Sequence, residues 1–346
     1  NNFLMELYLK NEADRSLMYE NFDKDVKSFI KNIDSSYAIR KSFYLKRKAE
    51  IGWDENFDAI AKASLEFHHI TKKEIYPYAH QFRTGENIRT KLPSNYYEHR
   101  KDVDFENALL INYSPFIKYV SVMLNNVALQ KDELDLNENS LENNIEKLNI
   151  TDTLIKNQKV KNVVLNNVAM MYLLEDQNMY NNQKFIDRYL KLTTDEKNKK
   201  EISEIYSSVQ NLKVGNRLPK INLINVSGQT TDINSSIKKP TVLFFWTSGA
   251  ESHFVAAHRK INELQAKYPD YNFIAINVND IKSKWENTLK KYNFDGITEL
   301  RCENFETIRK QWVITKIHRI IVLNADGTIK NGFANLFDVN FEQNLK

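Results

Sequence analysis

The chain has 346 residues, with 49 Lys and Arg against 45 Asp and Glu, so its formal net charge is only +4. This length suits two domains of ordinary size, and the interspersed charges exclude the clustered basic surface of a nucleic-acid-binding protein. With only 8 Gly and 6 Pro, the chain has too few turn residues for an all-β architecture, and most of it is predicted to be helical.

Residues 1–212 are predicted to form an all-α domain. Apolar side chains recur at helical spacing from Asp14 to Ile33 and from Phe57 to Phe67. Pro115 indicates a helix start, because proline fits a first turn. The polar segment from Asn137 to Asn149 is predicted to be an exposed loop or a short helix. Three further helices are predicted at Thr151 to Glu175, Asn178 to Leu192 and Thr194 to Leu212.

The pattern changes at Lys213, and residues 213–346 are predicted to form an α/β domain. Runs rich in β-branched and aromatic residues, typical of strands, lie at Ile221 to Val226, Thr241 to Trp246, Asn272 to Val278 and Ile317 to Asn324. Helical patterns lie between them, at Ser252 to Lys267, Ile281 to Tyr292 and Asn304 to Trp312. The Asp326-Gly327 turn then predicts a closing hairpin. This order of elements is that of a thioredoxin fold.

Two segments of this domain, Val214 to Leu223 and Pro240 to Ser248, resemble thiol-disulfide oxidoreductases of the TlpA/ResA type. Val214 to Leu223 is similar to the entry strand of that family, which reads V-G-x-x-x-P-x-F-x-L. Pro240 to Ser248 is similar to the family's strand ending in F-W-A-S. The fold class implied is an N-terminal all-α helical domain followed by a thioredoxin-like α/β domain.

The catalytic cysteines of that family are absent. Where the family has W-C-x-x-C, this chain has Ala250 at the nucleophile position and His253 at the resolving position. His318 stands where the family has its cis-proline. Because a cis peptide before a non-proline residue costs about 2.5–4 kcal/mol, the peptide before His318 is predicted to be trans. An alanine methyl cannot attack a disulfide, so the resemblance implies a redox-inactive member, not an enzyme, without a cofactor.

The single cysteine, Cys302, excludes an intramolecular disulfide. It lies beside Arg301, the one basic neighbour that the sequence identifies. We predict a small apolar core residue, the usual role of a lone cysteine, rather than a reactive thiol, which needs an electropositive environment.

Trp246, Glu251, His253 and His318 are predicted to line a groove around the former active site. One hypothesis is that this groove binds a protein partner, with polar residues filling an exposed rim. The alternative is a metal-binding or non-redox catalytic site made of His253, His318 and Glu251, with His258 near it, because two histidines and a carboxylate are suitable zinc ligands. The first hypothesis is favoured.

Two residue clusters stand out in the predicted helical domain. His68 and His69 invite a metal-binding interpretation, but adjacent helical residues point in different directions, and the useful spacing is four. Aromatic residues and arginines are interleaved further on, at Tyr76, Tyr78, Phe82, Arg83, Arg89, Tyr96, Tyr97 and Arg100. Such residues can stack on bases or sugars, but they more often build the edge of an amphipathic core or an interface. An interface is favoured over a glycan site.

TlpA-like proteins of Gram-negative envelopes carry a helical region ahead of the thioredoxin-like domain, and Asp104 to Ser114 is similar to a step in those regions. The resemblance implies a periplasmic protein, attached to the membrane by a lipid anchor, that serves as a binding or scaffold subunit. Its partner would be a protein of a cell-envelope or outer-membrane assembly. The chain begins at Asn1 rather than Met, where a removed secretory signal would fit. No run of about 18 apolar residues predicts a membrane span.

Overall fold

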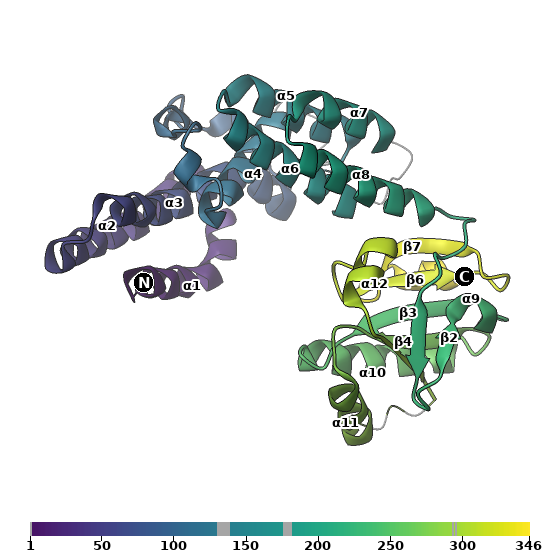
Figure 1. Ribbon diagram of the computed structural model, residues 1–346. Coiled ribbons are helices and arrows are strands. Elements are labelled where there is room, and N and C mark those ends of the chain that lie inside the picture. The colour runs from purple at the N-terminus through teal and green to yellow at the C-terminus, as the bar shows by residue number, and fades with distance from the viewer. Residues whose placement is uncertain (1, 130–138, 176–181, 293, 295) are drawn as a thin grey trace. The chain divides into compact units, whose positions relative to one another are not determined.

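The computed structural model describes residues 2–129, 139–175, 182–292, 294 and 296–346. It divides into two compact units, drawn from purple to teal and from green to yellow (Figure 1). Unit 1 comprises Asn1–Tyr172 and Gln183–Lys199, and unit 2 comprises Leu173–Asn182 and Lys200–Lys346. Among the described residues, no helix is long and apolar enough to cross a membrane.

The region before the sheet is helical, as predicted. Its α-helices are α1 (Asn2–Phe22), α2 (Val26–Ile51), α3 (Glu55–Thr84), α4 (Ser114–Leu129), α5 (Leu141–Leu154), α6 (Gln158–Glu175), α7 (Asn182–Leu192) and α8 (Glu196–Asn211). Three short 3-10 helices lie between α3 and α4, at Arg89–Lys91, Glu98–Asp102 and Ala108–Leu110. Pro115 lies in the first turn of α4, as predicted.

Two predicted helices are divided in the structure, and those predictions were wrong. The stretch from Asp14 to Ile33 is the end of α1 and the start of α2. Asp25 caps α2, because its side chain accepts a 3.0 Å hydrogen bond from the backbone N–H of Ser28. The stretch from Thr151 to Glu175 is shared between α5 and α6, and Asn157 accepts a backbone hydrogen bond where α6 begins. Such side chains give the backbone an alternative to a continuous helix.

Two other predictions fall partly outside the described residues. Within the polar segment from Asn137 to Asn149, residues 139–149 are described, and α5 begins there at Leu141. Leu148 is fully buried, so this part is not an exposed loop. For the helix predicted from Asn178 to Leu192, the described part is α7, from Asn182 onward.

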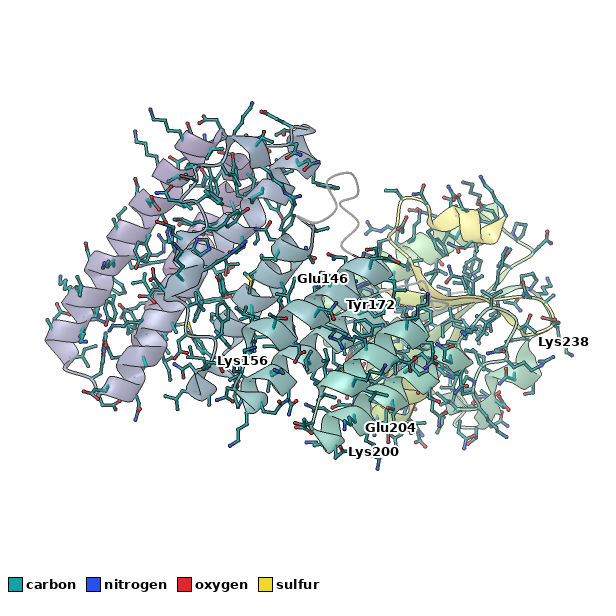
Figure 2. All side chains as sticks on the ribbon, turned by 90° about the horizontal axis from the view of Figure 1, so that it is seen from above. Glu146, Lys156, Tyr172, Lys200, Glu204 and Lys238 are labelled. Atoms are coloured by element: carbon teal, nitrogen blue, oxygen red, sulfur yellow. The ribbon has the colours of Figure 1, made fainter. Side chains whose placement is uncertain are left out.

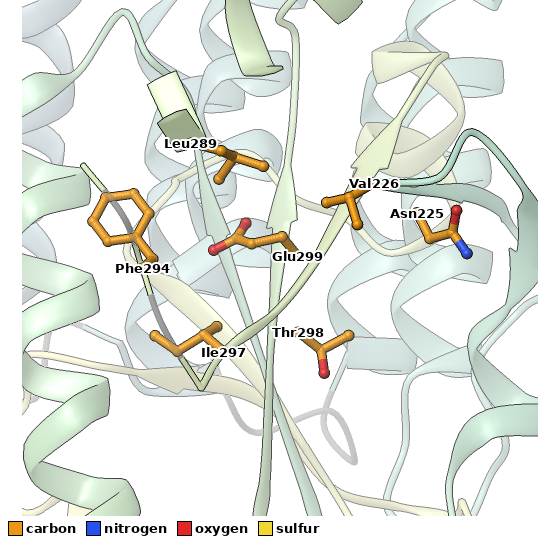
Figure 3. Close-up of a pocket in the computed structure, with 7 residues that line it drawn as sticks. All are labelled: Asn225, Val226, Leu289, Phe294, Ile297, Thr298 and Glu299. Carbon is orange, nitrogen blue, oxygen red and sulfur yellow. The ribbon is translucent and has the colours of Figure 1, made fainter. Parts of the chain in front are cut away.

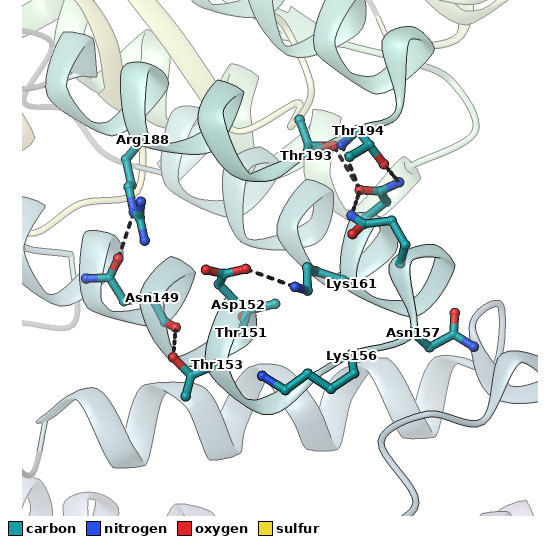
Figure 4. Close-up of polar contacts among 12 residues, drawn as sticks. Asn149, Thr151, Asp152, Thr153, Lys156, Asn157, Lys161, Arg188, Thr193 and Thr194 are labelled. Atoms are coloured by element: carbon teal, nitrogen blue, oxygen red, sulfur yellow. Dashed lines mark hydrogen bonds and ion pairs between the residues drawn. The ribbon is translucent and has the colours of Figure 1, made fainter.

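The later helices of unit 1 are joined by polar contacts as well as by their cores (Figure 4). Lys161 Nζ lies 2.9 Å from Asp152 Oδ1 and joins α6 to α5. Arg188 Nε donates a 2.8 Å hydrogen bond to Asn149 Oδ1 and joins α7 to α5. These contacts hold the helices side by side, because each pairs side chains of two different helices.

Unit 2 is built on a seven-stranded sheet in the order β2-β1-β5-β4-β3-β6-β7. The strands are β1 (Asn222–Asn225), β2 (Thr230–Asp232), β3 (Thr241–Trp246), β4 (Asn272–Asn277), β5 (Thr298–Cys302), β6 (Arg319–Leu323) and β7 (Ile329–Asn335). The helices are α9 (Ile233–Ser236), α10 (Glu251–Lys267), α11 (Lys282–Tyr292), α12 (Phe305–Gln311) and the 3-10 helix η4 (Phe341–Leu345). β3, β4 and β5 run parallel, and the remaining pairs are antiparallel.

Helices cover both faces of this sheet, so all six residues of the central strand β3 are buried. Phe244 and Trp246 share one hydrophobic core with α10 and α11. Leu243 and Phe245 point to the opposite core, which includes α12. The predicted hairpin joins β6 to β7 with Gly327 at a φ of 82°, a left-handed conformation that favours glycine.

The last turns of α8 belong to the same core as the sheet. Val209 and Leu212 are fully buried in it, whereas Lys200 and Glu204 are exposed on α8 (Figure 2). The packing against β7 is close: a Cβ added at Gly332 would lie 2.7 Å from the backbone oxygen of Leu212. The structure therefore assigns residues 200–212 to unit 2, whereas the predicted domain boundary lies between residues 212 and 213.

Candidate functional site

The position that corresponds to the family's cysteine motif in the sequence comparison lies where β3 leads into α10. Ala250 is the N-cap residue of α10, and its methyl group forms no capping hydrogen bond. Caps usually supply a side-chain oxygen to the first-turn N–H groups, so Ala250 leaves these groups without that acceptor. His253 follows within the first turn. Neither side chain is a nucleophile of the kind that the family's motif places here.

The loop before Ala250 is held by Asp280, a residue that sequence analysis did not single out. Asp280 accepts hydrogen bonds from the backbone N–H of Ser248 (2.6 Å), the Ser248 hydroxyl (2.8 Å) and the amide of Asn277 (2.7 Å). The Thr247 hydroxyl adds a longer one, at 3.2 Å. Burial raises the pKa of Asp280, but these hydrogen bonds outweigh it and lower the pKa overall. An ionised carboxylate therefore fixes the loop at neutral pH.

His253 and His318 are electrostatic neighbours, as the sequence predicted. Burial lowers the pKa of His253, and the charge of a protonated His318 lowers it further. Burial also lowers the pKa of His318, followed by the charge of Lys316. Among the described residues, both ring nitrogens of His253 lack a hydrogen-bond partner. The His253 ring meets Phe337 edge to face, with centroids 5.7 Å apart.

The backbone around His318 is also as predicted. The described chain contains no cis peptide bond, so the peptide before His318 is trans. The carbonyl oxygen of His318 accepts a 3.1 Å hydrogen bond from the backbone N–H of Leu336, just after β7. This bond joins His318 to the residue before Phe337, and the Phe337 ring in turn contacts the His253 ring.

Glu251 does not join the two histidines. Its carboxylate accepts a hydrogen bond from the Tyr292 hydroxyl and lies 3.6 Å from Lys291 Nζ, at the end of α11. Across the residues that the structure describes, no three His, Cys, Asp or Glu side chains are grouped to hold a metal ion. The alternative prediction of a metal site from His253, His318 and Glu251 was therefore wrong, because Glu251 is paired elsewhere.

The prediction that Trp246 lines a groove was also wrong. Its side chain is fully buried, and Nε1 donates a 3.1 Å hydrogen bond to Glu299 Oε2 on β5. The other carboxylate oxygen of Glu299 lies 3.0 Å from His258 Nε2. His258, which the sequence placed near the metal site, is only 1% exposed and belongs to this buried trio instead. Trp246 on β3, Glu299 on β5 and His258 on α10 thus form a buried polar cluster.

Cys302 is a core residue, as predicted. It is 2% exposed on β5, and its thiol donates a 3.2 Å hydrogen bond to the carbonyl oxygen of Asn304. Burial raises the pKa of the thiol. Because the thiolate is the reactive form of cysteine, this environment disfavours thiol chemistry at Cys302.

Part of the aromatic stretch in unit 1 belongs to a hydrophobic core, which is one of the two roles that the sequence left open. Tyr76 is fully buried and stacks on Phe29, with ring centroids 3.9 Å apart. Tyr96 is also buried. Arg100 is paired with the buried carboxylate of Glu74. Apolar packing and internal pairing thus explain these side chains, although Phe82 at the end of α3 is exposed.

The adjacent histidines of α3 also have separate surroundings. His69 Nε2 lies 3.3 Å from Asp34 Oδ1, and its ring stacks on Tyr37. The pKa of His68 is affected instead by Lys72 and Arg40, after burial. Among the described residues, no group of side chains that could hold a metal ion includes these two histidines.

Comparison with known proteins identifies the fold of unit 2. Residues 238–329 match a family described as thioredoxin-like. None of the curated proteins compared matches the chain. The predicted combination of a helical region and a thioredoxin-like α/β domain is confirmed, whereas assignment to the TlpA/ResA type stays a prediction.

Several solved structures are similar to part of the chain. A candidate thiol-disulfide oxidoreductase from Bacteroides vulgatus is 17% identical, over 38% of this chain and 94% of its own, with a TM-score of 0.35. A domain of a possible thiol-disulfide isomerase from Cytophaga hutchinsonii is 18% identical, over 39% and 91%, with a TM-score of 0.34. The thioredoxin domain of another Bacteroides vulgatus thiol-disulfide oxidoreductase is 16% identical, over 34% and 86%, with a TM-score of 0.29.

Proposed function

We propose that this protein is a redox-inactive, thioredoxin-like binding or scaffold subunit of a cell-envelope assembly. The observation that carries the proposal is the replacement of both motif cysteines by Ala250 and His253 at the start of α10. The remaining thiol, Cys302, is buried on β5. A chain with one cysteine has no dithiol to oxidise, so a role in binding accounts better for this domain than catalysis of disulfide exchange.

The partner-binding surface would be the face formed by His253, His318 and Phe337. Phe337 is 45% exposed, and Val339, two residues on, is 96% exposed. Exposed apolar side chains with polar ones beside them match the apolar centre and polar rim of a protein interface. The Asp280 contacts would keep the neighbouring loop in one conformation, which reduces the entropy lost on binding.

The proposed location is the periplasm, with a lipid anchor outside this sequence, and the partner would be an envelope or outer-membrane protein. Support comes from the resemblance of Val214 to Leu223 and Pro240 to Ser248 to envelope proteins of the TlpA/ResA type.

In an insulin-reduction assay with dithiothreitol, the wild-type protein is expected to give the rate of the buffer blank. The reason is that no pair of thiols exists to form the mixed disulfide and then resolve it. The double variant Ala250→Cys with His253→Cys, which restores both thiols, serves as the positive control and should exceed the blank. Turnover by the wild-type chain would show that the redox part of the proposal is incorrect.

The substitution Phe337→Asp is expected to reduce recovery of the partner about thirty-fold, the effect of losing one interface hot spot. The partner is first identified by a photo-crosslinking amino acid at position 337, in gently solubilised native envelopes. Its co-purification with the tagged wild-type chain and the variants is then quantified by mass spectrometry.

Phe82→Asp is the matched control, because it places the same charge at an exposed aromatic position of unit 1. If the partner is lost with Phe82→Asp and retained with Phe337→Asp, the partner binds unit 1 instead of the His253 face. Absence of any crosslink at position 337 would count against the proposed surface altogether.

A further inference from the structure

A pocket separate from the His253 face lies between the end of β1, α11 and β5 (Figure 3). Its volume is about 350 Å³, within the range of small-molecule sites. Val226, Leu289, Phe294 and Ile297 give it a largely apolar lining, and among the residues that the structure describes Glu299 is the one ionisable residue in that lining. Figure 3 shows the Glu299 carboxylate directed toward Leu289 and Phe294.

The carboxylate of Glu299 is held in one orientation before any ligand arrives. Trp246 Nε1 donates to Oε2, and His258 Nε2 lies 3.0 Å from Oε1. Phe294 stacks on the His258 ring, with centroids 3.7 Å apart, and so joins the pocket lining to this cluster. A carboxylate has about four acceptor positions, and these two contacts leave the others available. Glu299 is 8% exposed, so little water competes for them.

The number of protons held by His258 and Glu299 determines which ligand charge the pocket favours. His258 Nδ1 lies 2.7 Å from the carbonyl oxygen of Phe254, and Nε2 faces the Glu299 carboxyl group. Both partners are acceptors, so Nδ1 carries a proton and a second proton is shared between Nε2 and Oε1. The His258–Glu299 pair then has no net charge. An ammonium group entering the pocket would lose its hydration without gaining an unpaired negative charge from the lining residues that the structure describes.

We propose that this pocket binds a small neutral molecule with an apolar body of about one ring and one hydroxyl group, which donates a hydrogen bond to Glu299. The apolar lining buries the ring, and the oriented carboxylate selects the hydroxyl. This binding site is independent of the proposed partner-binding face, because it uses none of that face's residues.

The test uses three probes of similar shape: benzyl alcohol, toluene and benzylammonium. Each is titrated into the full chain labelled with ¹⁵N, and the indole N–H signals of its four Trp residues are followed by NMR. The Trp246 signal, assigned with Trp246→Phe, is expected to shift because its Nε1–H contacts Glu299. Benzyl alcohol is expected to bind about five-fold more tightly than toluene, the effect of one net hydrogen bond, and benzylammonium more weakly than either.

Two variants distinguish this pocket from general surface binding. Leu289→Trp fills the pocket without changing the carboxylate, and it should abolish binding of all three probes. Lys290→Trp, the exposed neighbour on the same helix, should leave binding unchanged. Glu299→Met should remove the preference for the alcohol over toluene. Equal binding of alcohol and toluene by the wild type, tightest binding of benzylammonium, or an unmoved Trp246 signal would overturn the proposal.

Discussion

Replacing Glu74 with glutamine is expected to destabilise the helical unit by about 3–5 kcal/mol, because it leaves a buried cation without its counter-charge. Glu74 is fully buried. Arg100 donates to both of its oxygens, at 2.8 and 2.7 Å, and Asn126 donates at 2.7 Å. His99 Nε2 lies 2.9 Å from Oε1. Burial raises the pKa of Glu74, but these contacts, led by Arg100 and His99, lower it to about 2.

The loss of unfolding free energy can be measured by urea denaturation of the full chain labelled with 5-fluorotryptophan. Trp53 lies in unit 1, and the other three tryptophans lie in unit 2. The ¹⁹F signal of Trp53 then reports the helical unit alone. Glu98→Gln is the control: that side chain is 62% exposed and pairs with Lys101 at 3.6 Å, so its loss should cost less than about 1 kcal/mol. A loss below about 1 kcal/mol for Glu74→Gln would show that Arg100 finds another partner.

Acidification is expected to destabilise the same unit through His68 and His69. Burial, followed by nearby lysine charges, lowers the pKa of each to about 3. In the unfolded chain each takes up its proton near pH 6.5. The unfolded state therefore binds more protons between these values, and stability falls as the pH drops from about 6.5 to 3, by about 1.4 kcal/mol per pH unit for each histidine.

The variant His68→Leu tests this, because leucine takes up no proton in either state. The pH dependence of the unfolding free energy, followed at Trp53 between about pH 4 and 6, should become shallower by about 1.4 kcal/mol per pH unit. His253→Leu, in the other unit, should leave the slope at Trp53 unchanged. Equal slopes in the wild type and His68→Leu would mean that His68 is protonated in the folded protein.

Four strands of unit 2, β1, β3, β4 and β6, could be predicted closely because their signal is local, whereas β5 (Thr298–Cys302) was not predicted. Thr241 to Trp246 is a continuous apolar run after Pro240, and β3 has these same bounds. The breaks between helices could not be predicted in the same way. Asp25 and Asn157 cap helices, but similar side chains recur throughout unit 1, and sequence alone does not show which of them takes a backbone hydrogen bond.

The candidate site was predictable only where a motif fixes positions. Ala250, His253 and His318 were located by alignment with the family's cysteines and proline. Asp280 and Glu299 were missed, because they contact Ser248 and Trp246 across 32 and 53 residues of sequence. Strand periodicity could have predicted that the Trp246 side chain points into the core. Side chains alternate along a strand, so Trp246 lies on the same face as Phe244 and on the opposite face from Phe245.

The packing of α8 limits how short a fragment of this chain can be and still fold as a thioredoxin-like domain. A gene fusion that carried residues 213–346 alone would leave behind Val209 and Leu212, and it would open one face of the sheet to water. The fragment would also lack the backbone of Leu212, which packs against Gly332 so closely that a side chain there would clash. A transferable module that keeps this core therefore includes the end of α8, from Lys200, as well as the sheet. A fusion that begins at residue 213 would yield an aggregation-prone product.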